Sequence, residues 1–188
     1  MSAAMPDPTP SGPMLSEVLR ARVLLPYKPE ARYVHRAVLT NAGNGSSPRL
    51  ANPETWVRID GTCGFDEPCY IAATGHFNAV EANITYNQLL YLAFAESVRQ
   101  GLIPELRHWT LDDFFRAQLP DVLIAKYHAD FRRPLRSASY SGWFTIVDVR
   151  AKPHRRMLLL QTRAGFHDAT GGECSVDATI AVVNWLPG

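Results

Sequence analysis

The stretch 70–91, which reads YIAATGHFNAVEANITYNQLLY, concentrates the side chains whose types and spacing suit chemistry. His76 and Asn78 come directly before a run with helical spacing. Three further polar residues follow at intervals of four: Asn83, Asn87 and Tyr91. Residues four apart share one helix face. Amide side chains on so apolar a helix cost stability unless they find partners or line a cavity, so this face is a candidate substrate pocket.

The start of such a helix offers chemistry of its own. Its first N–H groups lack partners within the helix and carry a partial positive charge. That end can polarise a thioester carbonyl and hold the oxyanion of an enolate. The same charge should keep His76 neutral, so that it can act as a base. Structural explanations compete: a histidine near a cap is commonly structural, the asparagines can bond to neighbouring backbone, and capping alone explains Glu81.

Other signatures of catalysis are absent from the sequence, which has no G-x-S-x-G elbow, Walker loop, G-x-G-x-x-G or H-E-x-x-H pattern. The three cysteines Cys63, Cys69 and Cys174 show no zinc-knuckle spacing and favour a reducing compartment over a disulfide framework. The net charge of +1 is not typical of nucleic-acid binding. We find no secretory signal and no apolar run of membrane length. We therefore expect a cytoplasmic protein that binds neither nucleic acid nor membrane.

One long helix must position these candidates. The sequence predicts it over 78–100, with Asn78 as N-cap, Glu81 three residues later as in a capping box, and Gly101 as the stop. The segment is apolar on most sides, which is typical of a buried helix.

Shorter elements complete the pattern. A helix is predicted over 15–25, with these residues on one side: Leu15, Val18, Leu19 and Val23. A second, amphipathic helix fits 111–119 behind Thr110. Strands are predicted over 33–39, 56–61, 122–127, 140–149, 157–164 and 174–185, with a short extended piece at 69–73. This order predicts an α+β fold, with an antiparallel sheet wrapped around the long helix.

The domain organisation is simple. Residues 1–13 are rich in Pro, Ala, Ser and Thr, which predicts a disordered tail. Residues 41–53 carry many turn-forming residues and should form an exposed loop. With no internal repeat, we expect one domain over 14–188.

The segment G-H-F-N-x-V-E resembles the G-H-F-P helix entry of hot-dog dehydratases that act on acyl-carrier-protein thioesters. In those enzymes the histidine is catalytic, and His76 occupies the matching place. Their helix also supplies an acid about four turns on. This chain has Leu89, Leu90 and Tyr91 at the comparable place, which disfavours dehydration.

The chain is more closely similar to the FcoT-type hot-dog family, over most of its length after the tail. The marks of the family are LLPY at 24–27, YIAATGHFNAVE at 70–81, YNQLLYLAF at 86–94, W-x-L-D-D-F at 109–114 and FRRPL at 131–135. Members are described as long-chain fatty acyl-CoA thioesterases or as (2E)-enoyl-acyl-carrier-protein glycyltransferases of isonitrile lipopeptide biosynthesis. Polar pocket residues of the family match Tyr27, Tyr70, Asn78 and Asn87.

This resemblance implies a single hot-dog domain that adds glycine to the β-carbon of a (2E)-enoyl thioester, without metal or cofactor beyond the phosphopantetheine that carries the substrate. Hydrolysis of an acyl thioester is the alternative, and a catalytically inactive acyl-binding subunit is a third hypothesis. The expected partners are an acyl carrier protein and a second copy of the chain, in a homodimer or larger homo-oligomer.

The expected site residues fall into three groups. The catalytic candidates are His76, Asn78 and Tyr70. The substrate-binding candidates are Tyr27, Gly75, Phe77, Glu81, Asn83, Asn87 and Tyr91. The carrier-docking candidates are Arg132, Arg133 and Arg136, joined by Arg155 and Arg156 if the two clusters converge; the alternative is an ordinary solvated surface.

Overall fold

The computed structural model describes residues 12–41, 57–71 and 76–188. Its centre is the helix α2, Ala79–Gln100. Asn78 caps the helix, and Glu81 completes a capping box. Gly101 ends it with a left-handed backbone at φ 64°, which glycine adopts without a steric penalty. Both predicted ends of the long helix are thus confirmed, because both depend on local side-chain and backbone chemistry.

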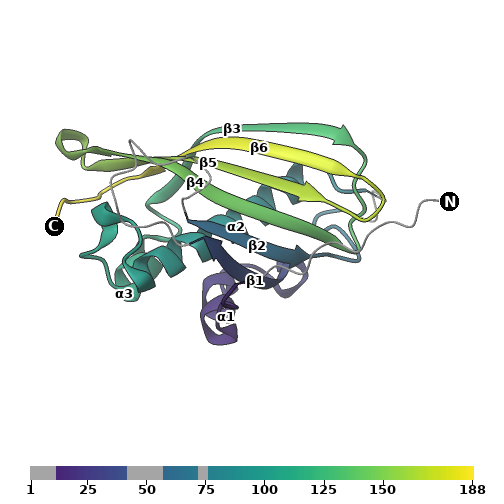
Figure 1. The fold of residues 1–188 in the computed structure, drawn as a ribbon, viewed down its shortest axis with the longest axis horizontal. Helices are drawn as coiled ribbons and strands as arrows, with labels where there is room; N and C mark the ends of the chain where they lie inside the picture. Colours follow the sequence, from purple (N-terminus) through teal and green to yellow (C-terminus); the bar gives the residue numbers. More distant parts are fainter. Residues whose placement is uncertain (1–11, 42–56, 72–75) are drawn as a thin grey trace.

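Six antiparallel strands form one sheet that wraps around α2 (Figure 1). They are β1 (Val34–Asn41), β2 (Arg58–Cys63), β3 (Val122–Arg133), β4 (Tyr140–Lys152), β5 (Met157–His167) and β6 (Glu173–Val182). Their order across the sheet is β1-β2-β4-β5-β6-β3. This arrangement confirms the predicted α+β class and hot-dog architecture.

Short helices complete the chain. They are α1 (Glu17–Leu24), α3 (Leu111–Ala117) and the 3₁₀ turns η1 (Pro29–Ala31), η4 (Pro104–Leu106) and η5 (Pro153–Arg155). In Figure 1, α1 and α3 lie on the same side of the sheet as α2. None of the helices in the described ranges is long and apolar enough to span a bilayer.

The helix approaches the sheet closely at one place. Gly61 of β2 and Gly142 of β4 are register partners. A Cβ atom on Gly61 would lie 3.0 Å from one methyl group of Leu89, and a Cβ atom on Gly142 would lie 3.2 Å from the other. The paired glycines therefore make room for Leu89, which is fully buried at the middle of α2.

Two polar side chains that α2 brings into the core, Gln88 and Tyr86, are paired with the surrounding elements. Gln88 accepts from the backbone N–H groups of Tyr33 and Val34, both at 3.0 Å, and donates to the Ala31 carbonyl. The Tyr86 hydroxyl meets the Thr162 hydroxyl of β5 at 2.6 Å. These bonds fix α2 against both halves of the sheet, because a buried polar group without a partner costs about 1–3 kcal/mol.

The two edges of the sheet differ. Residues 13–15 run along β1, where the Leu39 N–H donates to the Pro13 carbonyl and the Leu15 N–H donates to the Ala37 carbonyl. At the other edge, no segment in the described ranges pairs with the outer side of β3. The first edge is therefore covered, and the second is available for pairing.

Several expectations need correction or stay untested. Val18 was expected on the buried side of the first helix, yet it is 80% exposed, while Leu19 and Val23 are buried. Strand β3 extends six residues beyond the predicted end at Tyr127. Residues 69–71 form bends rather than a strand. The predicted tail falls almost wholly in 1–11 and the loop in 42–53, so both lie outside the described residues.

A buried carboxylate ties two turns together at one end of the sheet. Asp168, 8% exposed, accepts from the backbone N–H groups of Arg136, Thr170 and Gly172, and from the Thr170 hydroxyl. Burial alone would raise the pKa of Asp168, but these four donors together lower it to about 2. The β5–β6 turn is thereby fixed to the connection between β3 and β4.

We predict that Asp168→Asn lowers the free energy of unfolding by about 2 kcal/mol at pH 7. Because the folded-state pKa lies below the unfolded value near 3.8, this stabilisation is present above pH 4 and disappears as the pH falls towards 2. Urea unfolding of both proteins between pH 7 and pH 2.5 measures the gap. Asp177→Asn is the control, because its exposed ion pair with Arg163 contributes under about 1 kcal/mol. A gap that does not change with pH contradicts the assignment.

Candidate active site at the start of helix α2

The side chain of Asn78 is used at both of its ends. Its oxygen accepts from the Val80 N–H at 2.9 Å and caps the first turn of α2. Its amide nitrogen donates to the Tyr70 hydroxyl oxygen at 2.7 Å. The capping bond fixes which end of the amide faces which way, because only the oxygen can accept from the helix.

This bond leaves the Tyr70 hydroxyl with its own proton to donate. Tyr70 is 43% exposed, so an incoming carbonyl oxygen can reach it. The side chain of Asn78 also occupies the Val80 and Glu81 N–H groups. The sequence pointed to free backbone N–H groups here as oxyanion donors. The structure adds the Tyr70 hydroxyl, an exposed donor that the capping residue holds in place.

Phe77 anchors the entry to the helix. Its N–H donates to the Leu135 carbonyl at 3.0 Å, and its ring lies 5.0 Å from that of Tyr140 and 5.3 Å from that of Phe166. Phe77 is 2% exposed and was predicted to bind substrate; within this protomer it belongs to the core. Its neighbour His76 is exposed and lies two residues before Asn78 in the sequence.

Glu81 lies beneath this entry and is fully buried. One carboxylate oxygen accepts from the Asn78 N–H at 3.1 Å, and the other has no hydrogen-bond partner among the residues that the structure describes. Thr85 donates to the Glu81 carbonyl and accepts from the Tyr140 hydroxyl at 2.7 Å. Glu81 was expected to bind substrate; in the structure its carboxylate holds the backbone of Asn78 through this hydrogen bond.

The predicted polar stripe exists on α2. Asn87 donates to the Asn83 side-chain oxygen at 3.0 Å, and both residues are half-buried. Tyr91 is buried one turn further along and lies near Tyr27, from the segment after α1. Burial raises the pKa of Tyr27, so its hydroxyl stays protonated and can donate. Asn83, Asn87 and Tyr91 thus form a polar strip along one face of α2.

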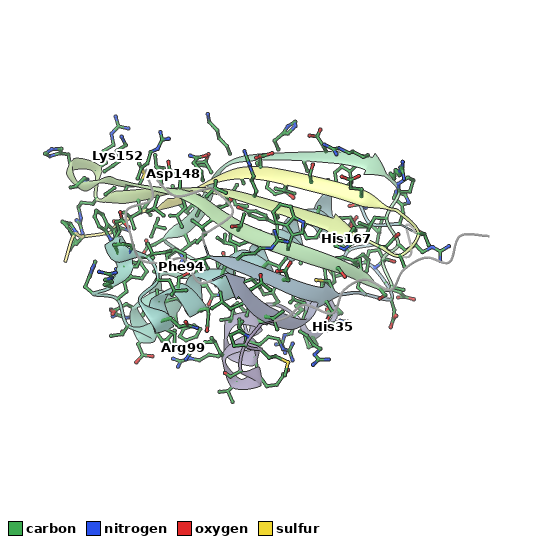
Figure 2. The ribbon with its side chains drawn as sticks, in the orientation of Figure 1. His35, Phe94, Arg99, Asp148, Lys152 and His167 are labelled. Carbon is green, nitrogen blue, oxygen red and sulfur yellow. The ribbon has the colours of Figure 1, made fainter. Side chains whose placement is uncertain are left out.

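The arginine clusters do not converge. Arg133 pairs in register with Glu173, and Glu173 with His167, at one end of the sheet. Arg155 lies in η5, beyond the Lys152–Met157 pair at the other end. Eleven residues of β5 separate these ends, which corresponds to roughly 34 Å. Figure 2 labels Lys152 and His167 towards opposite ends of these strands.

Only the first cluster lies at the same end as the start of α2. Leu135, whose carbonyl accepts from Phe77, stands between Arg133 and Arg136 in the sequence. Arg132, the third member, forms an ion pair with Glu173 at 3.0 Å. Arg155 and Arg156 are therefore not part of this site.

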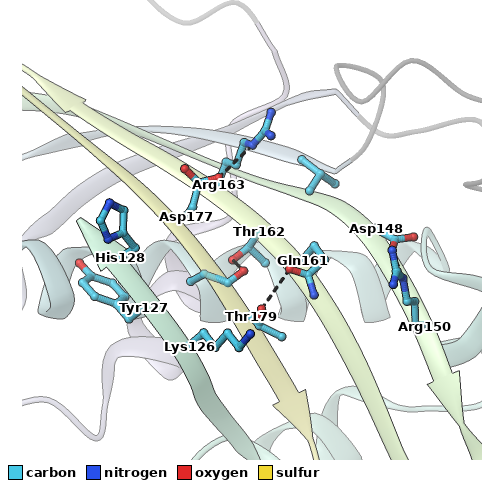
Figure 3. A pocket seen from close by; sticks show the side chains of 12 residues that line it. Lys126, Tyr127, His128, Asp148, Arg150, Gln161, Thr162, Arg163, Asp177 and Thr179 are labelled. Atoms are coloured by element: carbon cyan, nitrogen blue, oxygen red, sulfur yellow. Dashed lines mark hydrogen bonds and ion pairs between the residues drawn. The ribbon is translucent and has the colours of Figure 1, made fainter. Parts of the chain in front are cut away.

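A separate pocket of about 740 Å³ lies on the outer face of the sheet, between β3, β4, β5 and β6 (Figure 3). An ion pair between Arg163 and Asp177 and a hydrogen bond from Thr179 to Gln161 cross it. These side chains alternate with the buried Thr162 and Ala178, which face α2. The sheet therefore separates this pocket from the start of α2.

Sequence reasoning missed two parts of the site. Leu135 and Tyr140 follow the end of α2 by 35 and 40 residues, and no local pattern links them to it. The FRRPL segment pointed to the second region, but as a docking surface rather than as the backbone that anchors Phe77. Gly75, a predicted binding residue, lies outside the described residues. Within the described ranges no group of three or more His, Cys, Asp or Glu residues could hold a metal ion.

Known proteins share this architecture. A thioesterase-like protein from Syntrophus aciditrophicus superposes with a TM-score of 0.50 at 11% identity, over 89% of this chain and 97% of that chain. This likeness concerns the fold alone.

Relatives in sequence are more specific. The (2E)-enoyl-ACP glycyltransferase of Streptomyces coeruleorubidus is 39% identical over 176 residues, which are 91% of this chain and 99% of that protein. The enzyme of the same name from Mycobacterium marinum is 34% identical over 90% of this chain and 88% of its own length. The model of the FcoT-like thioesterase domain matches residues 22–182. The chain belongs to the FcoT-like thioesterase domain family.

Proposed function

We propose that this protein adds glycine to the β-carbon of a (2E)-enoyl thioester carried by an acyl carrier protein, the activity that its relatives' names describe. The observation that carries the proposal is the Tyr70 hydroxyl, held by the capping residue Asn78 with its proton directed away from the amide. Conjugate addition needs such a donor, because it places negative charge on the thioester oxygen.

The electron flow of the addition is simple. The neutral amine of glycine attacks the β-carbon, and the double-bond electrons move through the α-carbon onto the thioester oxygen. Tyr70 donates a hydrogen bond to this enolate oxygen. Protonation of the α-carbon restores the carbonyl. No bond to the thioester sulfur breaks, so the product stays on its carrier.

His76 is our candidate base. Glycine binds as an ammonium ion and must lose a proton before it can attack. His76 is exposed two residues before Asn78. In the proposed reaction it accepts this proton and returns it to the α-carbon. Asn78 at the cap, with Asn83 and Asn87 further along the helix, would orient the thioester and the glycine by hydrogen bonds.

Hydrolysis is the competing activity, since the family's description is thioesterase-like. The same site would then hold a water molecule in place of glycine. A single assay separates the two. We predict that an enoyl-acyl carrier protein incubated with the protein and glycine gains the mass of one glycine, as measured by intact-protein mass spectrometry. Release of free carrier thiol, with no adduct, would overturn the proposal in favour of hydrolysis.

We predict that His76→Ala lowers the turnover of this addition by about two to four orders of magnitude, the usual effect of losing a general base. The rate of adduct formation at saturating glycine gives the comparison. His154→Ala is the matched control, because His154 is exposed in η5 at the opposite end of the sheet. A folded His76→Ala variant that turns over at a rate near wild type would exclude this role.

The protein is further proposed to work as a homodimer that pairs through β3. Residues 13–15 cover the β1 edge, whereas β3 has an open edge and carries exposed apolar side chains on both of its faces, Leu123 at 42% and Phe131 at 44% exposure. An open strand edge with apolar residues favours pairing with a second copy related by two-fold symmetry.

Light scattering at micromolar concentration should give the mass of at least two chains. Leu123→Asp should shift it towards the monomer, because it replaces an exposed apolar side chain of the pairing strand with a charge that would have to lose water at the interface. Val18→Asp is the control, since Val18 is 80% exposed on α1, away from β3. A wild-type monomer, or a Leu123→Asp variant with unchanged mass, would contradict pairing through β3.

A further inference from the structure

A second pocket, of about 430 Å³, lies where the β3–β4 connection meets the β5–β6 turn. Its polar lining consists of Arg136, Ser139, Ser141, His167, Asp168 and Thr170. Ser141 and His167 are register partners on the face of the sheet that points away from α2, since their neighbours Tyr140 and Phe166 pack inward against Phe77. The pocket therefore opens outside the hot-dog core.

The charge of this pocket favours an anion. Arg136 is exposed, and its guanidinium has no ion pair among the described residues. Asp168 contributes the opposite charge, but four donors already satisfy its two oxygens. The Arg133 side chain lies beside Gly171, which belongs to the same β5–β6 turn as Thr170, and adds a second positive charge nearby. A ligand that enters this pocket therefore meets the Arg136 guanidinium, which has no ion pair among the described residues, and the Asp168 carboxylate, which already accepts four hydrogen bonds.

The pocket adjoins the start of α2 through the backbone. Arg136 directly follows Leu135, and the Leu135 carbonyl accepts from the Phe77 N–H at 3.0 Å. His76 and Asn78 flank Phe77. Two residue steps of 3.8 Å and one hydrogen bond place the Arg136 backbone within roughly 10–12 Å of these two residues. The pocket and the start of α2 therefore lie on opposite sides of the connection between β3 and β4.

We propose that this pocket binds the phosphate of the phosphopantetheine arm, with Arg136 as the cation that holds it. The inference rests on the proposed function, which makes a carrier-bound thioester the substrate. Arginine suits a phosphate because its guanidinium donates two parallel hydrogen bonds to phosphate oxygens. The arm then passes around Leu135 and delivers the thioester to Tyr70 and Asn78.

The glycine carboxylate is the other anion in this reaction, and the geometry disfavours it here. In glycine a single carbon separates the carboxylate from the attacking nitrogen, so both must lie within the catalytic site. The pocket lies on the outer side of the β3–β4 connection, whereas Tyr70 and Asn78 lie on the α2 side. A long pantetheine arm spans that separation, and glycine does not.

Calorimetric titration of the full chain with 4′-phosphopantetheine and with pantetheine tests the inference without turnover. We expect the phosphorylated compound to bind about 10- to 100-fold more tightly, the usual effect of a charge-assisted pair. Arg136→Gln should abolish this difference, and Arg155→Gln, at the far end of the sheet, should preserve it. Higher salt should reduce the difference in the wild type. Equal binding of both compounds by the wild type overturns the inference.

Steady-state kinetics of the Arg136→Gln variant distinguish the carrier phosphate from the glycine carboxylate as the anion that Arg136 binds. Arg136→Gln should raise KM about 10- to 100-fold for the carrier-bound enoyl thioester and leave the KM of an N-acetylcysteamine thioester unchanged, because the latter lacks the phosphate. A raised KM for glycine with both thioesters would assign Arg136 to the carboxylate and overturn the phosphate assignment. If phosphopantetheine binds through Arg136 but no adduct forms with any thioester, the proposed reaction fails and the phosphate site stands.

Discussion

The structure depends on burying a 22-residue helix that still carries polar side chains. A sheet closes around such a helix at low cost only where the inward-facing polar groups meet partners, because the interior offers no water to replace them. Gln88 meets this requirement towards β1, and Tyr86 meets it towards β5. These bonds act at different rotations about the helix axis. They therefore select one orientation of α2, which apolar packing alone would leave less strictly defined.

That fixed orientation determines what the start of the helix presents. With Gln88 and Tyr86 turned into the core, Asn83 and Asn87 must occupy another face, where they remain half-buried. At the first turn, Asn78 satisfies the helix and holds Tyr70 with one amide group. The fully buried Glu81 in turn holds the backbone of Asn78. Structural capping and the alignment of a proton donor are thus achieved by the same few atoms.

The sequence predicted the features that depend on local chemistry. The bounds of α2 follow from Asn78, Glu81 and Gly101, each acting within a few residues of its own position. It failed where the partner comes from far along the chain. Strand β3 was predicted too short because its outer half carries His128, Asp130 and arginines, whose polarity hides a strand that pairs with β6 on one side only. The separation of the two arginine clusters follows from the pairing of β4 with β5, and no composition argument can reveal that register.

The close approach of Leu89 to Gly61 and Gly142 has a consequence for how this family can change over time. The two glycines face each other across β2 and β4, and each contacts a different methyl group of the same leucine. Enlarging either glycine crowds Leu89; at Gly142 it also crowds the Phe166 ring at 3.0 Å, and at Gly61 it also crowds the Arg36 carbonyl oxygen at 3.1 Å. A change at either glycine therefore needs matching changes in its neighbours, so substitutions among relatives should be correlated across these contacting positions and should follow the spacing between helix and sheet.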